Sequence, residues 1–269
     1  MLKYKAHVLR LLDSRAEKFT PAELKNILCR KYGLQKKETA ALIRTMAAEG
    51  ELSYADLHGR TVIDISYNRP VRISPRIFLI PADIPFVPGK GQTAVRLLHG
   101  VSFGTGQHPT TRMSLAGLDL LLEGKDISRS FISDKSRVLD IGTGSGVLAI
   151  AALKLGITRG IGLDIDPCAI AEARENARIN GLSDRLEISA RSLEEIKQPF
   201  DLICANLRLP TLKSLQTQIL RLAAPESGLL ISGIHPEEVP VILKVYRDFR
   251  CIRQQEEKNW AMLAFARKR

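Results

Sequence analysis

The sequence is poor in aromatic residues and in cysteine. Only 5% of its 269 residues are Phe, Trp or Tyr, and one of them is tryptophan. The four cysteines, Cys29, Cys168, Cys204 and Cys251, are scattered without a CxxC spacing. This pattern argues against a disulfide framework or a zinc site. We therefore expect reduced thiols, no bound metal and a cytoplasmic protein.

Long hydrophobic runs are also missing. No apolar run reaches the roughly 20 residues that span a bilayer, so we expect no membrane association. Residues 1–15 carry charges throughout, which is unlike a secretory signal. The composition, 45% hydrophobic and 26% charged, is that of an ordinary globular protein. The length allows one large core, or a core with a small second domain.

Acidic residues are scarcer than basic ones. Lys and Arg total 40 against 29 Asp and Glu, which makes a formal net charge of +11. Residues 1–70 hold 13 basic and 8 acidic residues, so the excess is densest at the N-terminal end. A basic protein favours nucleic acid, acidic proteins or ribosomes as partners. A merely solvated basic surface would have the same composition.

Residues 1–69 have the pattern of a small helical domain. After a first helical segment, Thr20 and Pro21 predict a helix start, and Glu23 completes a capping box. A third helix is expected over 35–49, followed by two short strands. Three helices and a hairpin resemble a winged helix-turn-helix domain.

In DNA-binding domains of that type, the third helix enters the major groove. Here it would present Lys36, Lys37 and Arg44, and the hairpin would add Arg60. Two glutamates dilute this basic face, and such domains also dock proteins. Nucleic-acid binding and protein docking through residues 1–69 both remain open.

A proline-rich segment, 67–91, follows this domain. Its composition predicts short edge strands and a linker that belong to neither core. We place the domain boundary between residues 69 and 70, with residues 1–69 recognising a substrate or partner and residues 70–269 forming the second domain.

The strongest pattern begins at residue 137. RVLDIGTGSGVLAIAALKLG predicts a buried strand, a glycine turn and a helix, and RGIGLDID predicts a second strand that ends in acids. Gly142 and Gly144 allow a ligand to approach the backbone beside a helix N-terminus. Asp164 lies 22 residues after Gly142, where an acid accepts hydrogen bonds from ribose hydroxyls. Val147 breaks the GxGxxG dinucleotide pattern.

These residues resemble the class I methyltransferases. Helices and strands continue to alternate and end in two extended segments that suit an antiparallel edge hairpin. The expected fold is α/β, a Rossmann-like seven-stranded sheet with a small N-terminal winged-helix-like domain. FGTGQHPTT at 103–111, together with the glycine turn, GLDIDPCAI, ANL and ISGI, is similar to the methyltransferases of ribosomal protein L11, the PrmA family. This resemblance covers residues 70–269.

The resemblance implies S-adenosyl-L-methionine as the cofactor. It implies contacts from Thr111, Gly142, Asp164 and Asn206, and Gly144 belongs to the same glycine turn. Thr111 would place its hydroxyl at a helix N-terminus that suits the methionine carboxylate. Asn206 is also the candidate catalytic residue, because related amine methyltransferases use such a residue to accept hydrogen bonds from the target nitrogen.

The expected function is methyl transfer to lysine or N-terminal amines of a protein, by resemblance a ribosomal one. Two alternatives remain open: an RNA or DNA methyltransferase guided by the basic winged helix, and a non-catalytic regulator that senses the cofactor. His108 is either a proton shuttle or, as is more usual before a helical proline, a turn residue or helix cap.

Overall fold

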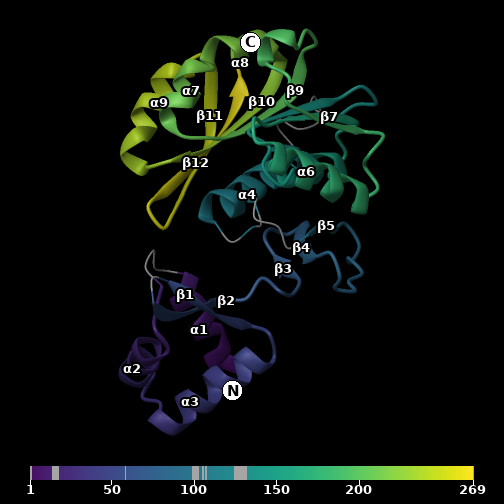
Figure 1. The fold of residues 1–269 in the computed structure, drawn as a ribbon. Coiled ribbons are helices and arrows are strands. Elements are labelled where there is room, and N and C mark those ends of the chain that lie inside the picture. The colour runs from purple at the N-terminus through teal and green to yellow at the C-terminus, as the bar shows by residue number, and fades with distance from the viewer. Residues whose placement is uncertain are drawn as a thin grey trace. The chain divides into compact units, whose positions relative to one another are not determined.

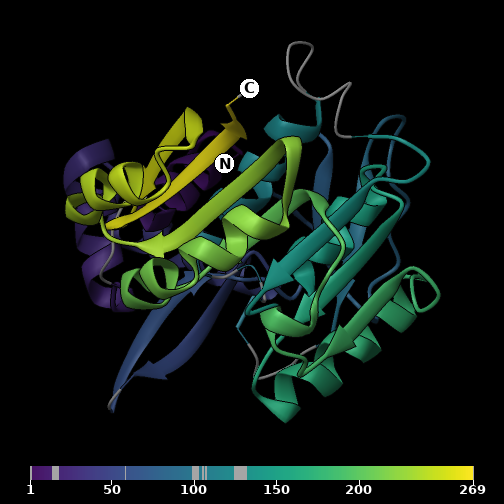
Figure 2. The same ribbon diagram turned by 90° about the horizontal axis from the view of Figure 1, so that it is seen from above.

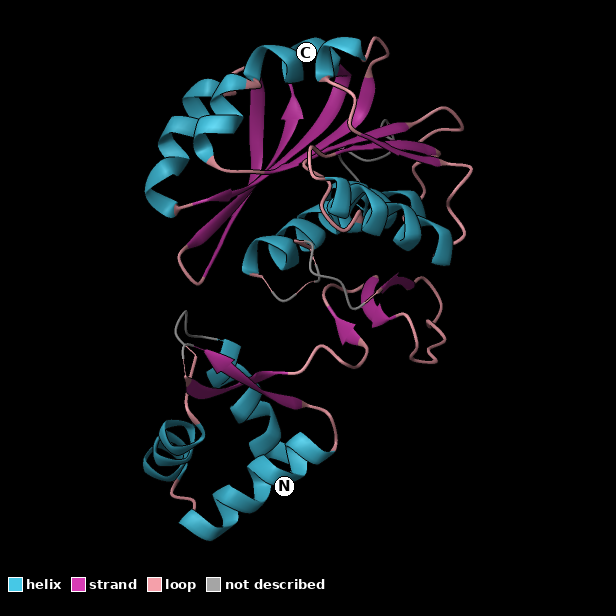
Figure 3. Ribbon diagram, viewed as in Figure 1, coloured by secondary structure: helices cyan, strands magenta, loops and turns pink. Residues whose placement is uncertain are grey.

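The computed structural model describes residues 2–13, 18–57, 59–98, 103–104, 106, 108–123 and 132–268. The chain divides into two compact units, Met1–Arg69 and Pro70–Arg269. Figure 1 follows the chain through its elements, and Figure 3 separates helices from strands. Each unit has its own buried hydrophobic cluster. In the described segments, no helix combines the length and the apolarity needed to cross a membrane.

The first unit has three helices and a two-stranded antiparallel sheet. In chain order these are α1 (Leu2–Asp13), α2 (Pro21–Tyr32), α3 (Lys36–Ala48), β1 (Leu52–Leu57) and β2 (Arg60–Ile65). Phe19, between α1 and α2, forms an antiparallel bridge with Ile63 of β2. A residue before α2 thus joins the hairpin that follows α3, which is the arrangement of a winged helix.

The helix boundaries in this unit follow from local sequence. Thr20 caps α2, its side chain accepts from the Glu23 N–H, and Glu23 accepts from the Thr20 N–H at 2.8 Å. Gly33 ends α2 with a φ of 68°. Helix α3 buries Thr39, Leu42, Ile43 and Met46, whereas Ala41 is exposed.

The second unit begins with a three-stranded sheet made of β3 (Val71–Arg72), β4 (Ile77–Pro81) and β5 (Thr93–Leu97). The expectation that residues 67–91 stay outside the cores was wrong. Ile77 and Leu79 of β4 are buried in the same hydrophobic cluster as the main sheet. Prolines mark the ends of these segments, while the alternating apolar residues of β4 face the core.

An ion pair fastens this small sheet to the first large helix, α4 (Pro109–Glu123). Arg76 Nε donates to Asp119 Oδ1 at 2.5 Å, and Arg76 Nη2 donates to the Asp119 carbonyl at 2.7 Å. Asp119 is buried, so loss of Arg76 would leave an unpaired carboxylate in the core and destabilise the fold.

The main sheet has seven strands in the order β11-β12-β10-β9-β6-β7-β8. Figures 1 and 2 show its strands fanning as the sheet twists. β12 runs antiparallel to both of its neighbours, and the remaining pairs are parallel. The strands are β6 (Arg137–Ile141), β7 (Arg159–Leu163), β8 (Leu186–Ser189), β9 (Phe200–Asn206), β10 (Ala223–Ile234), β11 (Phe249–Glu257) and β12 (Trp260–Arg267).

Helices cover both faces of this sheet (Figure 1). One face carries α4, α5 (Val147–Lys154) and α6 (Pro167–Ile179), whose apolar residues share one core cluster. The other face carries α7 (Leu209–Ser214), α8 (Gln216–Leu222) and α9 (Val239–Val245), in a second cluster. This is the predicted α/β fold class of a class I methyltransferase, with a sheet buried on both sides.

Candidate functional site

The candidate site lies at the carboxyl ends of the central strands. From β6 the chain proceeds to β7 and β8, and then returns to β9 on the other side of β6. The strand order therefore reverses between β6 and β9. In open α/β sheets, ligands bind outside the carboxyl ends of the strands at such a switch point.

A tight glycine loop joins β6 to α5. Gly144 has a φ of 53°, and a Cβ atom on it would lie 2.4 Å from the carbonyl oxygen of Phe103. That same carbonyl accepts a hydrogen bond from the Ser145 N–H at 2.9 Å. Only glycine fits at position 144, both because of its φ and because of this close approach. Phe103 of the FGTGQHPTT segment therefore lies against the glycine loop, although about 40 residues separate the two in sequence.

Asp164, directly after β7, is bonded to this loop. Its Oδ2 accepts from the Gly144 N–H at 2.9 Å, and its Oδ1 accepts from the Asp166 N–H at 3.1 Å. A carboxylate offers about four lone-pair sites, so each oxygen keeps capacity for another donor. Asp164 therefore both orders the loop and presents acceptors beside it.

A second carboxylate also stabilises the loop. Sequence analysis did not single it out. Asp140 of β6 is buried, and its Oδ2 accepts from Thr143 Oγ1 at 2.7 Å and from the Ala149 N–H at 3.3 Å. Burial raises the pKa of Asp140 to about 6, although the two hydrogen bonds oppose the shift. The ionised form of Asp140 therefore lowers the stability of the folded state at neutral pH.

Asp140→Asn is expected to raise stability at pH 7 and to flatten its pH dependence. The folded-state pKa lies above the ordinary 3.8, so the folded state binds the proton more tightly. Stability should then fall as pH rises from about 4 to about 6, by up to about 3 kcal/mol. The asparagine carbonyl still accepts from Thr143 and Ala149. Urea unfolding at pH 4, 5, 6 and 7 tests this, and an identical pH slope in both proteins would contradict it.

Two further side chains of the candidate site, those of His108 and Thr111, lie at the N-terminus of α4. The Thr110 N–H donates to Nδ1 of His108 at 3.3 Å, so His108 caps the helix. Its pKa is lowered by burial first, and then by the charges of Arg112 and Arg208. The imidazole is therefore neutral at neutral pH. Thr111 is 1% exposed, and its hydroxyl oxygen has no hydrogen-bond partner in the described parts of the chain.

A hydrogen-bond chain links His108 to Asn206 at the end of β9. Because Nδ1 of His108 accepts from the Thr110 N–H, the Thr110 hydroxyl, 2.7 Å away, donates to the same nitrogen. The hydroxyl oxygen then accepts from Nδ2 of Asn206 at 3.2 Å. This network assigns the amide orientation. Oδ1 of Asn206 is left buried without a partner among the described residues.

An aromatic and cationic cluster lies on the other side of His108. The Trp260 ring stacks on His235 with centroids 4.5 Å apart, and its centroid lies 5.0 Å from that of His108. The guanidinium carbon of Arg208 lies 5.0 Å from the Trp260 centroid. Phe103 extends the cluster at 5.0 Å from His108. His108 thus connects this aromatic and cationic cluster to the Thr110–Asn206 hydrogen bond.

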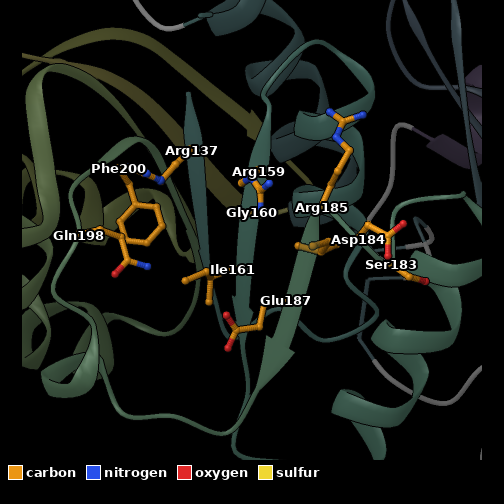
Figure 4. A pocket seen from close by; sticks show the side chains of 11 residues that line it. Arg137, Arg159, Gly160, Ile161, Ser183, Asp184, Arg185, Glu187, Gln198 and Phe200 are labelled. Carbon is orange, nitrogen blue, oxygen red and sulfur yellow. The ribbon is translucent and has the colours of Figure 1, made fainter. Parts of the chain in front are cut away.

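A separate cavity of about 310 Å³ opens at the amino ends of β6, β7 and β8. Figure 4 shows Arg137 and Arg159, which are paired in register on neighbouring strands, together with Asp184, Glu187 and Phe200 in its lining. It lies at the opposite end of the strands from the glycine loop. This cavity is therefore not part of the candidate site. Over the described residues, no group of His, Cys, Asp and Glu is arranged to hold a metal.

The structure brings the predicted site residues to one edge of the sheet. Gly142 and Gly144 form the loop, Asp164 is bonded to it, and Thr111 and Asn206 lie at the α4 terminus. Sequence analysis missed Asp140, Ser145 and Trp260. A lone tryptophan near the C-terminus was the one visible signal, and its neighbours are distant in sequence.

Comparison with known proteins bears on this site. A family model described as Ribosomal protein L11 methyltransferase (PrmA) matches residues 61–268. The chain belongs to this family. The expected membership is confirmed, and the match includes every residue of the candidate site.

Relatives and a solved structure agree with the family. The ribosomal protein L11 methyltransferase of Geotalea uraniireducens is 34% identical over 203 residues, 74% of this chain and 64% of that protein. That of Tolumonas auensis is 38% identical over 201 residues, 72% of this chain and 63% of that protein. A crystal structure of ribosomal protein L11 methylase from Lactobacillus delbrueckii subsp. bulgaricus aligns with a TM-score of 0.64 at 29% identity, covering 75% of this chain and 100% of that chain.

The chain spans less than two thirds of the length of these curated PrmA relatives. The family model begins at residue 61, so most of the first unit lies outside the matched region. The common part is the sheet with its carboxyl-edge site.

Proposed function

We propose that this chain transfers a methyl group from S-adenosyl-L-methionine to an amine nitrogen of a protein, and that ribosomal protein L11 is the acceptor. PrmA membership and the printed names of the relatives support the acceptor. The observation that carries the chemistry is Asn206, which is oriented through Thr110 and whose buried Oδ1 has no hydrogen-bond partner within the described segments. An acceptor on the ribosome places the proposed reaction in the cytoplasm.

The residues at this edge fit the proposed cofactor. Among the described residues, the buried hydroxyls of Thr111 and Ser145 have no hydrogen-bond partner, although buried hydroxyls normally have one. Thr111, at the α4 N-terminus, would hold the carboxylate of the methionine part. Asp164 would accept from the ribose hydroxyls, and Ile165, which is 96% exposed beside it, offers an apolar surface to the adenine ring.

S-Adenosyl-L-methionine supplies an already activated methyl group on its sulfonium sulfur. The protein's own task is then to position the acceptor nitrogen and exclude water, since in-line attack needs about 3–3.5 Å between the reacting atoms. Oδ1 of Asn206 accepts a hydrogen bond from an N–H of the neutral amine and thereby directs its lone pair. Asn206 needs no charge for this role and removes no proton.

The acceptor amine must be neutral, although a lysine amine has an ordinary pKa near 10.4. The surroundings favour the neutral form. The charges of Arg112 and Arg208 already lower the pKa of His108, after the larger effect of burial. The same positive potential acts on an amine that enters beside Asn206, and burial lowers its pKa further.

The test is transfer of a radiolabelled methyl group into purified ribosomal protein L11 and into a cell extract. We expect label in the purified protein, and label in the extract that resists nuclease but is released by protease. Label released by nuclease would favour the nucleic-acid methyltransferase instead. Cofactor binding without transfer to any acceptor would favour a cofactor-sensing regulator.

Acceptor recognition is proposed to reside in residues 1–69 and the chemistry in residues 70–269. The two units have separate hydrophobic cores, and the site residues all lie in the second. Deleting residues 1–69 should leave cofactor affinity within about threefold, but lower methylation at limiting acceptor concentration by about tenfold through lost docking. Calorimetry and initial rates measure the two effects. Unchanged methylation by the truncated protein would contradict the division.

A further inference from the structure

The acidic side chains of the first unit that the structure describes are hydrogen-bonded through at least one oxygen. Each carboxylate whose side chain the structure describes accepts a hydrogen bond from a cation or a backbone N–H. These residues are Glu23, Glu38, Glu49, Glu51, Asp56 and Asp64. The two glutamates of the basic face, Glu38 and Glu49, are among them. Glu38 bonds to the Gln35 N–H at the start of α3, and Glu49 bonds to Lys5 of α1.

The cations around α3 are not paired in this way. Lys36, Lys37 and Arg44 are exposed, and in the described part of the chain none of them has a carboxylate partner. Arg30 and Lys31, at the end of α2, are exposed as well. The stretch RKYGLQKK, residues 30–37, therefore holds four exposed cations and no acid. Arg60 of the hairpin differs from expectation, because it pairs with Glu23 at 2.6 Å.

The position of two lysines strengthens the positive electrostatic potential around α3. Lys36 and Lys37 occupy the first turn of α3, where the helix dipole disfavours positive charge. Their charges and the positive helix end therefore reinforce one another. These two cations slightly destabilise the helix in the free protein. A bound anion would remove that unfavourable interaction, so their position favours an anionic partner.

Between and beyond these cations, the exposed side chains along this line of α3 are small. Ala41 and Ala48 lie along the line of Lys37 and Arg44, and all four side chains are exposed. Lys37 and Arg44 are two helical turns apart, about 10 Å along the axis. We call Lys36, Lys37, Ala41, Arg44 and Ala48 the α3 face.

We propose that the α3 face binds the sugar–phosphate backbone of double-stranded DNA. A single helix with small central residues fits a groove about 12 Å wide, and cations at its ends meet the flanking phosphates. α2 and α3 are joined by only Gly33–Gln35, as in helix-turn-helix units. The face lacks the large apolar or aromatic anchors that dominate protein interfaces, which favours nucleic acid over an acidic protein. This proposal goes beyond methyl transfer and does not depend on it.

The test measures binding of the full chain to a fluorescein-labelled 20-base-pair DNA duplex of mixed sequence. Its RNA counterpart, whose major groove is too narrow for a helix, serves as the comparison and should bind more weakly. Fluorescence anisotropy is recorded between 50 and 300 mM salt. We expect salt-dependent binding, and K36A/K37A/R44A should weaken it at least about tenfold at low salt. Its logarithmic salt slope should fall by about 0.9 for each lost phosphate contact. Alanine favours helix, and circular dichroism checks that the variant folds.

K244A/R247A/R250A is the matched control. These residues lie in the second unit, are exposed, and their removal lowers the net charge by the same amount. The control should stay within about threefold of the parent protein. S-Adenosyl-L-methionine affinity should be unchanged in both variants, which separates this proposal from methyl transfer. Absence of duplex binding at 50 mM salt, equal weakening by both variants, or equally tight binding of polyglutamate would overturn it.

Discussion

Replacing Asn206 by Ala is expected to slow methyl transfer by about 100- to 1,000-fold, the range seen when one preorganised polar group is removed from an active site. Alanine removes the Oδ1 acceptor that directs the amine lone pair. Cofactor affinity should change by less than about tenfold, since the glycine loop and Asp164 remain. Single-turnover rates with radiolabelled cofactor and calorimetric titration separate the two quantities. A variant with full activity would remove Asn206 from the mechanism.

Thr110→Val is the companion variant. Valine keeps the volume of the buried threonine but loses the hydroxyl that connects His108 with Asn206. The amide of Asn206 then loses its fixed orientation, and we expect about a tenfold slower transfer, the cost of one hydrogen bond. Thr110→Ser should recover most of the rate. If valine and serine were equally active, the orienting role of Thr110 would be wrong, whereas the role of Asn206 would stand.

Asp164→Ala is expected to weaken S-adenosyl-L-methionine binding by about 10- to 150-fold. Loss of a hydrogen bond to a charged group costs about 1.5–3 kcal/mol. The change removes the acceptor offered to the ribose and also the bond to Gly144 that orders the loop. Calorimetric titration of a folded variant measures the effect, and unchanged affinity would refute the assigned contact.

Asp166→Ala provides the neighbouring control. Asp166 lies two residues away, and its Oδ1 accepts from the Cys168 N–H at 2.8 Å as the cap of α6. Removing this cap should cost about 1 kcal/mol of stability but leave cofactor affinity within about threefold. An equal loss of affinity in both variants would mean that the acidic segment acts through folding rather than through contact.

Local signals explain which elements were predictable. The capping box of Thr20 and Glu23, the end of α2 at Gly33 and the glycine turn after β6 depend on residues within a few positions of one another. The break between α7 and α8 at Leu215 and the burial of β4 were not predicted. Periodicity describes a segment alone, whereas burial of Ile77 and Leu79 is decided by a core supplied mainly by distant helices.

By itself, the sequence determined the α/β class and the two-part pattern, because both rest on short-range spacing. Its resemblance to PrmA supplied the family and the candidate site residues. The tertiary structure decided how those residues act together. Asn206 meets Thr110 across 96 positions, and Trp260 gathers His108, Arg208 and His235 from three separate segments. The charges of the first unit were also decided by tertiary structure. Glu49 pairs with Lys5 and Arg60 pairs with Glu23, so these residues differ from the unpaired cations of the α3 face. Such contacts depend on the packed chain, since hydrogen bonds need donor–acceptor distances of about 3 Å and charge interactions in water are screened beyond about 10 Å.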